Sequence, residues 1–190
     1  MNTTNYLVMT NHQKVLSFMA KFSDKEFYER EIARKTGISY GSANKVLNDL
    51  YSAHLLMRQQ KGKMFFYQLN LKDSIARHFK IINTMVLLRP LILNLRKLTT
   101  RVILFGSCAT GHDTSDSDID IFIVSEKKQM TLRIIEKIEL GRGFEEIQIQ
   151  PIIFSHSEVI DSEKNDEEFL SLVREGIILW DKTVEGSEFY

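Results

Sequence analysis

Residues 101–124, RVILFGSCATGHDTSDSDIDIFIV, constrain the fold more than any other part of this sequence. Two short apolar runs, 102–105 and 119–124, are rich in β-branched and aromatic residues, as expected of buried strands. The first run is followed by Gly-Ser, and two aspartates lie at the head of the second. Because side chains two positions apart share one face of a strand, Asp118 and Asp120 should project together.

This stretch has the residue types of a metal and phosphate site. Two carboxylates held close together repel each other unless a cation lies between them, and oxygen ligands suit Mg2+. Gly106 would let the backbone approach a phosphate, and the Ser107 hydroxyl and the amides after it could donate to phosphate oxygens. We therefore expect Asp118 and Asp120 to bind metal, and Gly106 and Ser107 to bind a nucleotide's phosphates.

The spacing of these residues resembles that of a known family. Gly106-Ser107, ten residues and Asp118-x-Asp120 form the Gly-Ser-x10-Asp-x-Asp pattern of minimal nucleotidyltransferases in the polymerase-β-like superfamily. The resemblance covers about residues 85–182 and implies a mixed β-sheet flanked by helices, with Mg2+ and ATP or another nucleoside triphosphate as cofactors. The implied reaction is two-metal transfer of a nucleoside monophosphate, AMP in the first instance, to a protein or small-molecule hydroxyl.

The sequence departs from the family pattern at the third carboxylate, which active members carry on a later strand. The equivalent position aligns with Gln150, while Gln148 and Glu146 share its face in other registers. An amide binds metal weakly and cannot act as a general base. We therefore expect Gln150 to join Asp118 and Asp120 as a catalytic-site residue, in a domain that either transfers slowly or only binds nucleotide.

The two halves of the chain carry opposite charge. Residues 1–100 contain 16 Lys and Arg against 6 Asp and Glu, whereas residues 101–190 contain 9 against 19. This asymmetry favours two modules with different partners, and the basic half would suit a polyanion. The alternative is a charge drift along one domain.

The basic half has three helical patterns, in residues 11–22, 26–37 and 38–56, followed by a hairpin around Lys61-Gly62-Lys63. This order resembles the winged helix-turn-helix domains of transcription regulators and implies DNA binding through the third helix and the wing. Such domains also serve as protein-interaction modules. The expected DNA-binding residues are Ser39, Tyr40, Ser42, Asn44, Lys45 and Asn48 on the helix and Arg58, Lys61 and Lys63 on the wing.

The segment between the modules has helical spacing, and we expect Pro90 to break it into a long and a short helix. Its apolar face could join two copies in a homodimer or pack between the domains. The sequence thus predicts an α+β protein. A winged helix occupies residues 1–71, linker helices 72–98 and the nucleotidyltransferase domain 99–190.

A single cysteine excludes an internal disulfide and favours a reducing compartment. We expect a cytoplasmic protein, because no signal peptide is recognisable and the most apolar tract is too short and broken to span a membrane. The expected partners are DNA, a nucleoside triphosphate and a protein acceptor. The acceptor could be a toxin, because minimal nucleotidyltransferases often act as antitoxins. The alternative functions are a transcription regulator whose degenerate transferase domain only senses a nucleotide, and an interaction module with neither activity.

Overall fold

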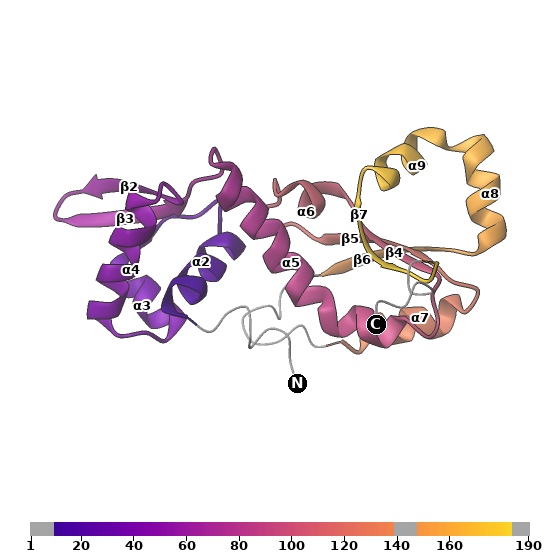
Figure 1. Ribbon diagram of the computed structural model, residues 1–190, viewed down its shortest axis with the longest axis horizontal. Coiled ribbons are helices and arrows are strands. Elements are labelled where there is room, and N and C mark those ends of the chain that lie inside the picture. The colour runs from indigo at the N-terminus through magenta and orange to yellow at the C-terminus, as the bar shows by residue number, and fades with distance from the viewer. Residues whose placement is uncertain (1–9, 139–147, 184–190) are drawn as a thin grey trace. The chain divides into compact units, whose positions relative to one another are not determined.

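The computed structural model describes residues 10–138 and 148–183. The chain forms two compact units, Met1–Val86 and Leu87–Tyr190, and helix α5 (Ser74–Leu95) runs from the first unit into the second (Figure 1). No helix in the described ranges is long and apolar enough to cross a membrane.

The first unit packs three helices against an antiparallel sheet with the strand order β1-β3-β2. Its core is built from apolar side chains of all these elements, among them Val15, Ile32, Leu47 and Tyr67. The elements are α2 (Asn11–Lys21), β1 (Phe27–Tyr28), α3 (Glu29–Thr36), α4 (Tyr40–Ser52), β2 (Leu56–Lys61) and β3 (Met64–Leu69).

The ends of α3 and α4 follow from local chemistry. Gly37 ends α3 with φ +68, a left-handed conformation that glycine adopts without strain, and its N–H donates to Ala33. Ser39 then caps α4, because its hydroxyl accepts a hydrogen bond from the Ser42 N–H at 3.2 Å. These two residues place α4 directly after a short turn, as the helix-turn-helix pattern predicted.

The start of α3 differs from the prediction. The helical pattern was expected from residue 26, but Phe27 and Tyr28 are extended and pair with Tyr67 and Phe66 of β3. Phe27 is buried, and its ring packs on Phe18 at a centroid distance of 4.8 Å. The aromatic core and the sheet pairing therefore override the helical pattern here.

Helix α5 continues through Pro90, so the predicted break is wrong. Proline removes the N–H that would bond to the Val86 carbonyl, which costs about 3 kcal/mol. Burial of the next turn offsets this loss, since each buried aliphatic side chain contributes about 1.5–3 kcal/mol. Three apolar side chains after the proline are fully or almost fully buried: Leu91, Ile92 and Leu95.

The second unit contains a mixed sheet with the strand order β6-β5-β4-β7, flanked by helices (Figure 1). β5 and β6 are parallel, and the other neighbouring pairs are antiparallel. The predicted α+β class and mixed sheet are therefore confirmed. The elements are β4 (Arg101–Leu104), α6 (Gly106–Thr110), β5 (Ile119–Val124), α7 (Lys128–Glu136), β6 (Ile149–Phe154), α8 (His156–Asn165), α9 (Glu167–Arg174) and β7 (Ile177–Asp181).

Three polar segments converge at one end of this sheet. β4 ends there and leads into Gly106, and the antiparallel β5 begins there after Asp118, with Leu104 opposite Ile121. The parallel strand β6 begins at the same end, so Gln150 lies beside β5. The topology thus brings together residues that are up to 44 positions apart in the sequence.

Candidate functional site

Gly106 and Asp120 lie in close contact at this end of the sheet. Gly106 has φ +69, and a Cβ atom built on it would lie 2.6 Å from Oδ2 of Asp120. The Phe105 N–H donates to the Asp120 carbonyl at 3.1 Å, which fixes the two backbones relative to each other. The absence of a side chain at position 106 therefore leaves the space that the Asp120 carboxylate occupies.

The two aspartates are both half-buried. Burial raises the pKa of the Asp120 carboxyl above its usual 3.8, and the negative charge of Asp118 raises this pKa further. Both causes disfavour a negative charge on Asp120 beside that of Asp118, and a bound cation would offset their effect on the pKa. The electrostatics of the pair therefore favour a divalent cation.

Gln150 completes the group on the neighbouring strand. It is the register partner of Asp120, and its Nε2 donates a hydrogen bond of 2.8 Å to Oδ2 of Asp118. Gln148, the alternative position, accepts the Ile119 N–H with its backbone carbonyl at 2.9 Å. Glu146, the other alternative, lies outside the described residues.

The short helix α6 begins at Gly106 and places Ser107 directly after it. Its last turn closes on Gly111, whose φ of +75 ends the helix, and the Gly111 N–H donates to the Ser107 carbonyl. Cys108 is buried, and its thiol donates to the Asp118 carbonyl at 3.5 Å. Cys108 thus ties the helix to the start of β5, a role that the sequence did not reveal.

The donor set fits Mg2+ in part. Asp118 and Asp120 supply the oxygen ligands that this ion prefers, and Gln150 adds a polar amide. In residues 10–138 and 148–183, no group of three or more His, Cys, Asp or Glu side chains is arranged to hold a metal ion. Water and the phosphates of a nucleotide would therefore have to complete the coordination shell.

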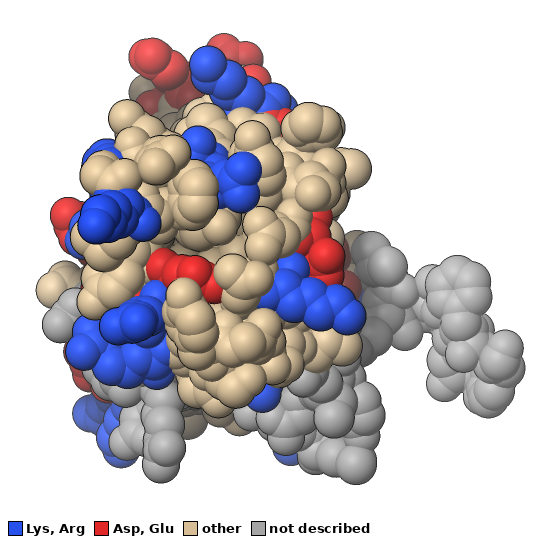
Figure 2. Space-filling model, turned by 90° about the vertical axis from the view of Figure 1, so that its left-hand side faces the viewer, with Lys and Arg blue, Asp and Glu red and all other residues tan. Residues whose placement is uncertain are grey.

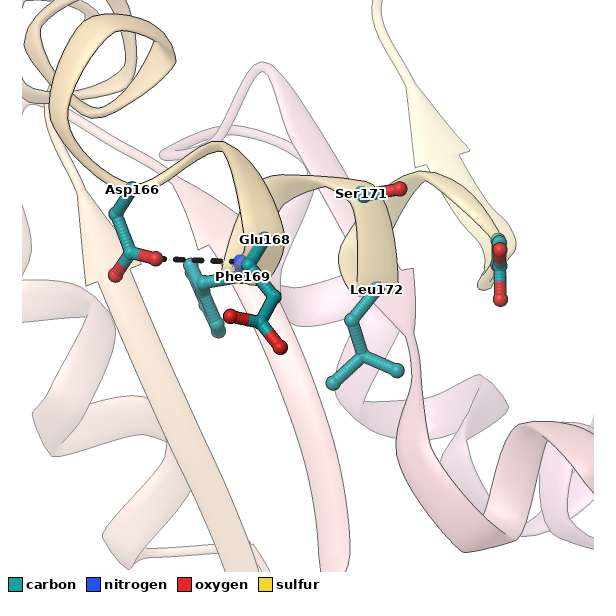
Figure 3. Close-up of a pocket in the computed structure, with 6 residues that line it drawn as sticks. Asp166, Glu168, Phe169, Ser171 and Leu172 are labelled. Carbon is teal, nitrogen blue, oxygen red and sulfur yellow. Dashed lines mark hydrogen bonds between the residues drawn. The ribbon is translucent and has the colours of Figure 1, made fainter.

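A depression of about 500 Å³ lies along α9, away from the predicted site residues (Figure 3). The Asp166 carboxylate accepts the Phe169 N–H at 3.2 Å and caps the helix. Three carboxylates line this hollow and would repel a polyphosphate, so we do not assign it to the nucleotide. The lining residues are Asp166, Glu168, Phe169, Ser171, Leu172 and Glu175.

The residues predicted for DNA contact lie on α4 and on the β2–β3 hairpin. Tyr40, Asn44 and Lys45 are exposed on α4, whereas Ser42 and Asn48 are half-buried and Ser39 serves as the cap. The Tyr40 hydroxyl donates to Glu29 at 3.0 Å. Figure 2, which views the molecule from the hairpin end, shows several separate groups of Lys and Arg side chains with acidic groups among them.

The three wing residues have different surroundings. Lys63 is exposed beside Gly62 at the hairpin turn, and Lys61 forms an ion pair with Glu26. Arg58 is half-buried, with its guanidinium 4.2 Å from the ring centre of Tyr51 and 4.6 Å from that of Phe65. Tyr51 approaches from α4 and Phe65 from β3, across the hairpin. These aromatic contacts were not predicted, because they depend on how the helix and the hairpin pack.

Comparison with known proteins adds the family of the second unit. Residues 92–185 match the family model described as "Polymerase beta, Nucleotidyltransferase", which confirms a nucleotidyltransferase-family domain in this part of the chain. Among solved structures, the chain is similar to the transcriptional regulator BldR from Sulfolobus solfataricus. The sequences are 13% identical, the match covers 50% of this chain and 67% of that chain, and the TM-score is 0.37. No curated protein matches the chain.

Proposed function

We propose that the nucleotidyltransferase domain binds a nucleoside triphosphate with Mg2+ and transfers a nucleoside monophosphate, AMP in the first instance, to a hydroxyl of a protein acceptor. The observation that carries this proposal is the contact between Gly106 and Asp120, because a carboxylate occupies the space of a missing side chain. A structural role alone would not require two half-buried carboxylates that have no cationic partner within residues 10–138 and 148–183.

Each residue of the group has a task in this reaction. Asp118 and Asp120 would hold Mg2+, which neutralises charge on the reacting phosphate when it is bound. The backbone at Gly106 and the Ser107 hydroxyl would orient the phosphates. Gln150 holds one oxygen of Asp118 through its hydrogen bond and leaves the other oxygen available.

A second function is favoured by this same hydrogen bond. Because the amide of Gln150 cannot take a proton from the acceptor, transfer would be slow or would depend on a carboxylate of the acceptor. In that case the domain senses the nucleotide without consuming it. The two functions differ in turnover and share the binding step.

A labelling experiment distinguishes the two. The protein is incubated with ATP labelled on its α-phosphate, Mg2+ and cell extract, and in parallel with a purified candidate acceptor such as a cognate toxin. Transfer predicts a labelled acceptor, and the label should disappear in the Asp118→Ala, Asp120→Ala double variant. ATP binding without label supports the sensor, and loss of both would leave an interaction module.

We further propose that the first unit binds DNA through α4 and the hairpin. The supporting observations are the exposed Asn44 and Lys45 on one face of α4 and the exposed Lys63 at the wing. A gel-shift assay with the DNA upstream of the protein's own gene tests this, and affinity should fall with salt. Lys45→Ala or Lys63→Ala should weaken binding, whereas binding that is independent of salt would refute DNA recognition.

A further inference from the structure

Hydrogen bonds run from the wing to the outer face of α4. Nη1 of Arg58 donates to Oδ1 of Asn48 at 3.3 Å. Nδ2 of Asn48 then donates to the carbonyl of Asn44 at 3.0 Å and to its Oδ1 at 3.3 Å. We call this chain, from Arg58 through Asn48 to Asn44, the amide relay.

Arg58 fixes the direction of every bond in the amide relay. A guanidinium has five N–H donors and no acceptor, so the atom of Asn48 that faces it must be oxygen. The other end of the Asn48 amide is then the NH2 group, which requires an oxygen from Asn44. The Asn44 side chain therefore has its oxygen engaged, and its own NH2 group remains for a ligand.

The surroundings of Arg58 show that it is held in place. Its guanidinium contacts the rings of both Tyr51 and Phe65, and it is half-buried on β2. Burial raises the pKa of the neighbouring Tyr67 hydroxyl, and a hydrogen bond with Arg58 opposes that rise. Because Arg58 donates to Asn48 and Tyr67 and its guanidinium contacts two aromatic rings inside the domain, it is poorly placed to follow a phosphate backbone.

We propose that Arg58 is a positioning residue that makes Asn44 a hydrogen-bond donor in the major groove, so that Asn44 selects guanine. Guanine presents two acceptors, N7 and O6, at that edge, whereas adenine combines an acceptor with a donor and cytosine presents a donor. Asn44 is exposed near the start of α4, where recognition helices meet base edges. This inference rests on the proposed DNA binding.

Selection of binding sites from a library of random duplexes tests the proposal. The full-length protein should enrich sites with guanine at one position, and Asn44→Ala should abolish that preference. Arg58→Met should weaken the same preference at least about fivefold, while the slope of log affinity against log salt stays unchanged. Arg58→Lys should retain the preference, because lysine also only donates.

Two variants serve as controls. Lys63→Met removes an exposed wing charge, so it should reduce the salt slope by about 0.9 and leave the base preference intact. Asn48→Leu breaks the middle of the amide relay and keeps the contacts of Arg58 with the rings of Tyr51 and Phe65. It should reproduce the loss of preference even if Arg58→Met does not fold.

The failures are distinguishable. If Arg58→Met reduces the salt slope by about 0.9 and keeps the guanine preference, Arg58 contacts phosphate and the positioning role is wrong. If Asn44→Ala keeps every base preference, Asn44 does not read the groove. If the wild-type protein enriches no sequence, sequence-specific DNA binding itself fails, and the relay proposal fails with it.

Discussion

Replacing Gly106 with alanine places a methyl group 2.6 Å from Oδ2 of Asp120, at a backbone φ of +69. The Asp120 carboxylate must move, because 2.6 Å is too short for a contact between a methyl carbon and an oxygen. The next nearest atoms to the added Cβ are Cγ of Asp120 at 3.4 Å and its Cβ at 3.6 Å, so the whole clash falls on this one side chain. The fold can absorb this change, but the carboxylate leaves the position where it would share a cation with Asp118. We therefore expect binding of Mg2+ with ATP to suffer more than stability.

The magnitude follows from separable costs. An alanine in the left-handed region costs about 1–2 kcal/mol, and the reduced freedom of the unfolded chain returns about 0.4–1 kcal/mol. Moving Asp120 off its rotamer adds about 0.5–1.5 kcal/mol. The free energy of unfolding should thus fall by about 0.5–3 kcal/mol. Loss of one of two carboxylate ligands should lower the affinity for Mg2+ with ATP at least about tenfold.

Gly37→Ala is the matched control, since Gly37 has φ +68 and nothing lies within 4 Å of the added Cβ. It shares the backbone strain and lacks the clash. Urea denaturation gives the two stabilities, and titration calorimetry gives the affinities. If Gly106→Ala binds Mg2+ with ATP as tightly as Gly37→Ala does, the argument that Gly106 positions Asp120 is refuted.

Three further substitutions test the electrostatics and packing of the second unit. Burial, and then the charge of Asp118, raise the pKa of Asp120 above 3.8, so stability of the metal-free protein should fall as pH rises through that raised pKa. Asp120→Asn should remove this dependence and raise the melting temperature at neutral pH; an unchanged pH profile would contradict the assignment. Gln150→Glu should lower the metal-free melting temperature and tighten Mg2+ binding about tenfold by calorimetry, and unchanged affinity would show that position 150 does not face the metal. Gly176→Ala should cost about 2–3 kcal/mol in urea denaturation, because its Cβ would lie 2.5 Å from the Leu104 backbone oxygen; a cost below about 0.5 kcal/mol would contradict this clash.

The sequence predicted the features that depend on short-range patterns. The end of α3 at Gly37, the helical pattern of α4 and the paired aspartates each follow from residues a few positions apart. The mixed sheet followed from the family resemblance. Strand β1 and the unbroken α5 could not be predicted in this way, because both depend on apolar burial that outweighs a local preference.

The candidate site was predicted in its residues but not in its contacts. The sequence singled out Gln150 as the substitute for a carboxylate, whereas its bond to Asp118 depends on the register of β5 and β6. The contact of Cys108 with Asp118 and the amide relay from β2 to α4 also depend on which segments meet in the folded chain. Hydrogen-bond direction depends on which atoms meet, and a one-dimensional pattern contains no such information.

The amide at position 150 lowers the negative charge of the site in the absence of any ligand. A third carboxylate there would add a like charge to a pair that burial already disfavours, so the fold would depend more strongly on metal. The N–H of Gln150 instead stabilises Asp118 by donating to it. The amide that replaces a proton-accepting carboxylate therefore also makes the metal-free state more stable. A domain that stays folded with and without metal and nucleotide can report whether nucleotide is bound. Under the proposed function, the Gln150 side chain therefore favours both slow turnover and a regulatory role.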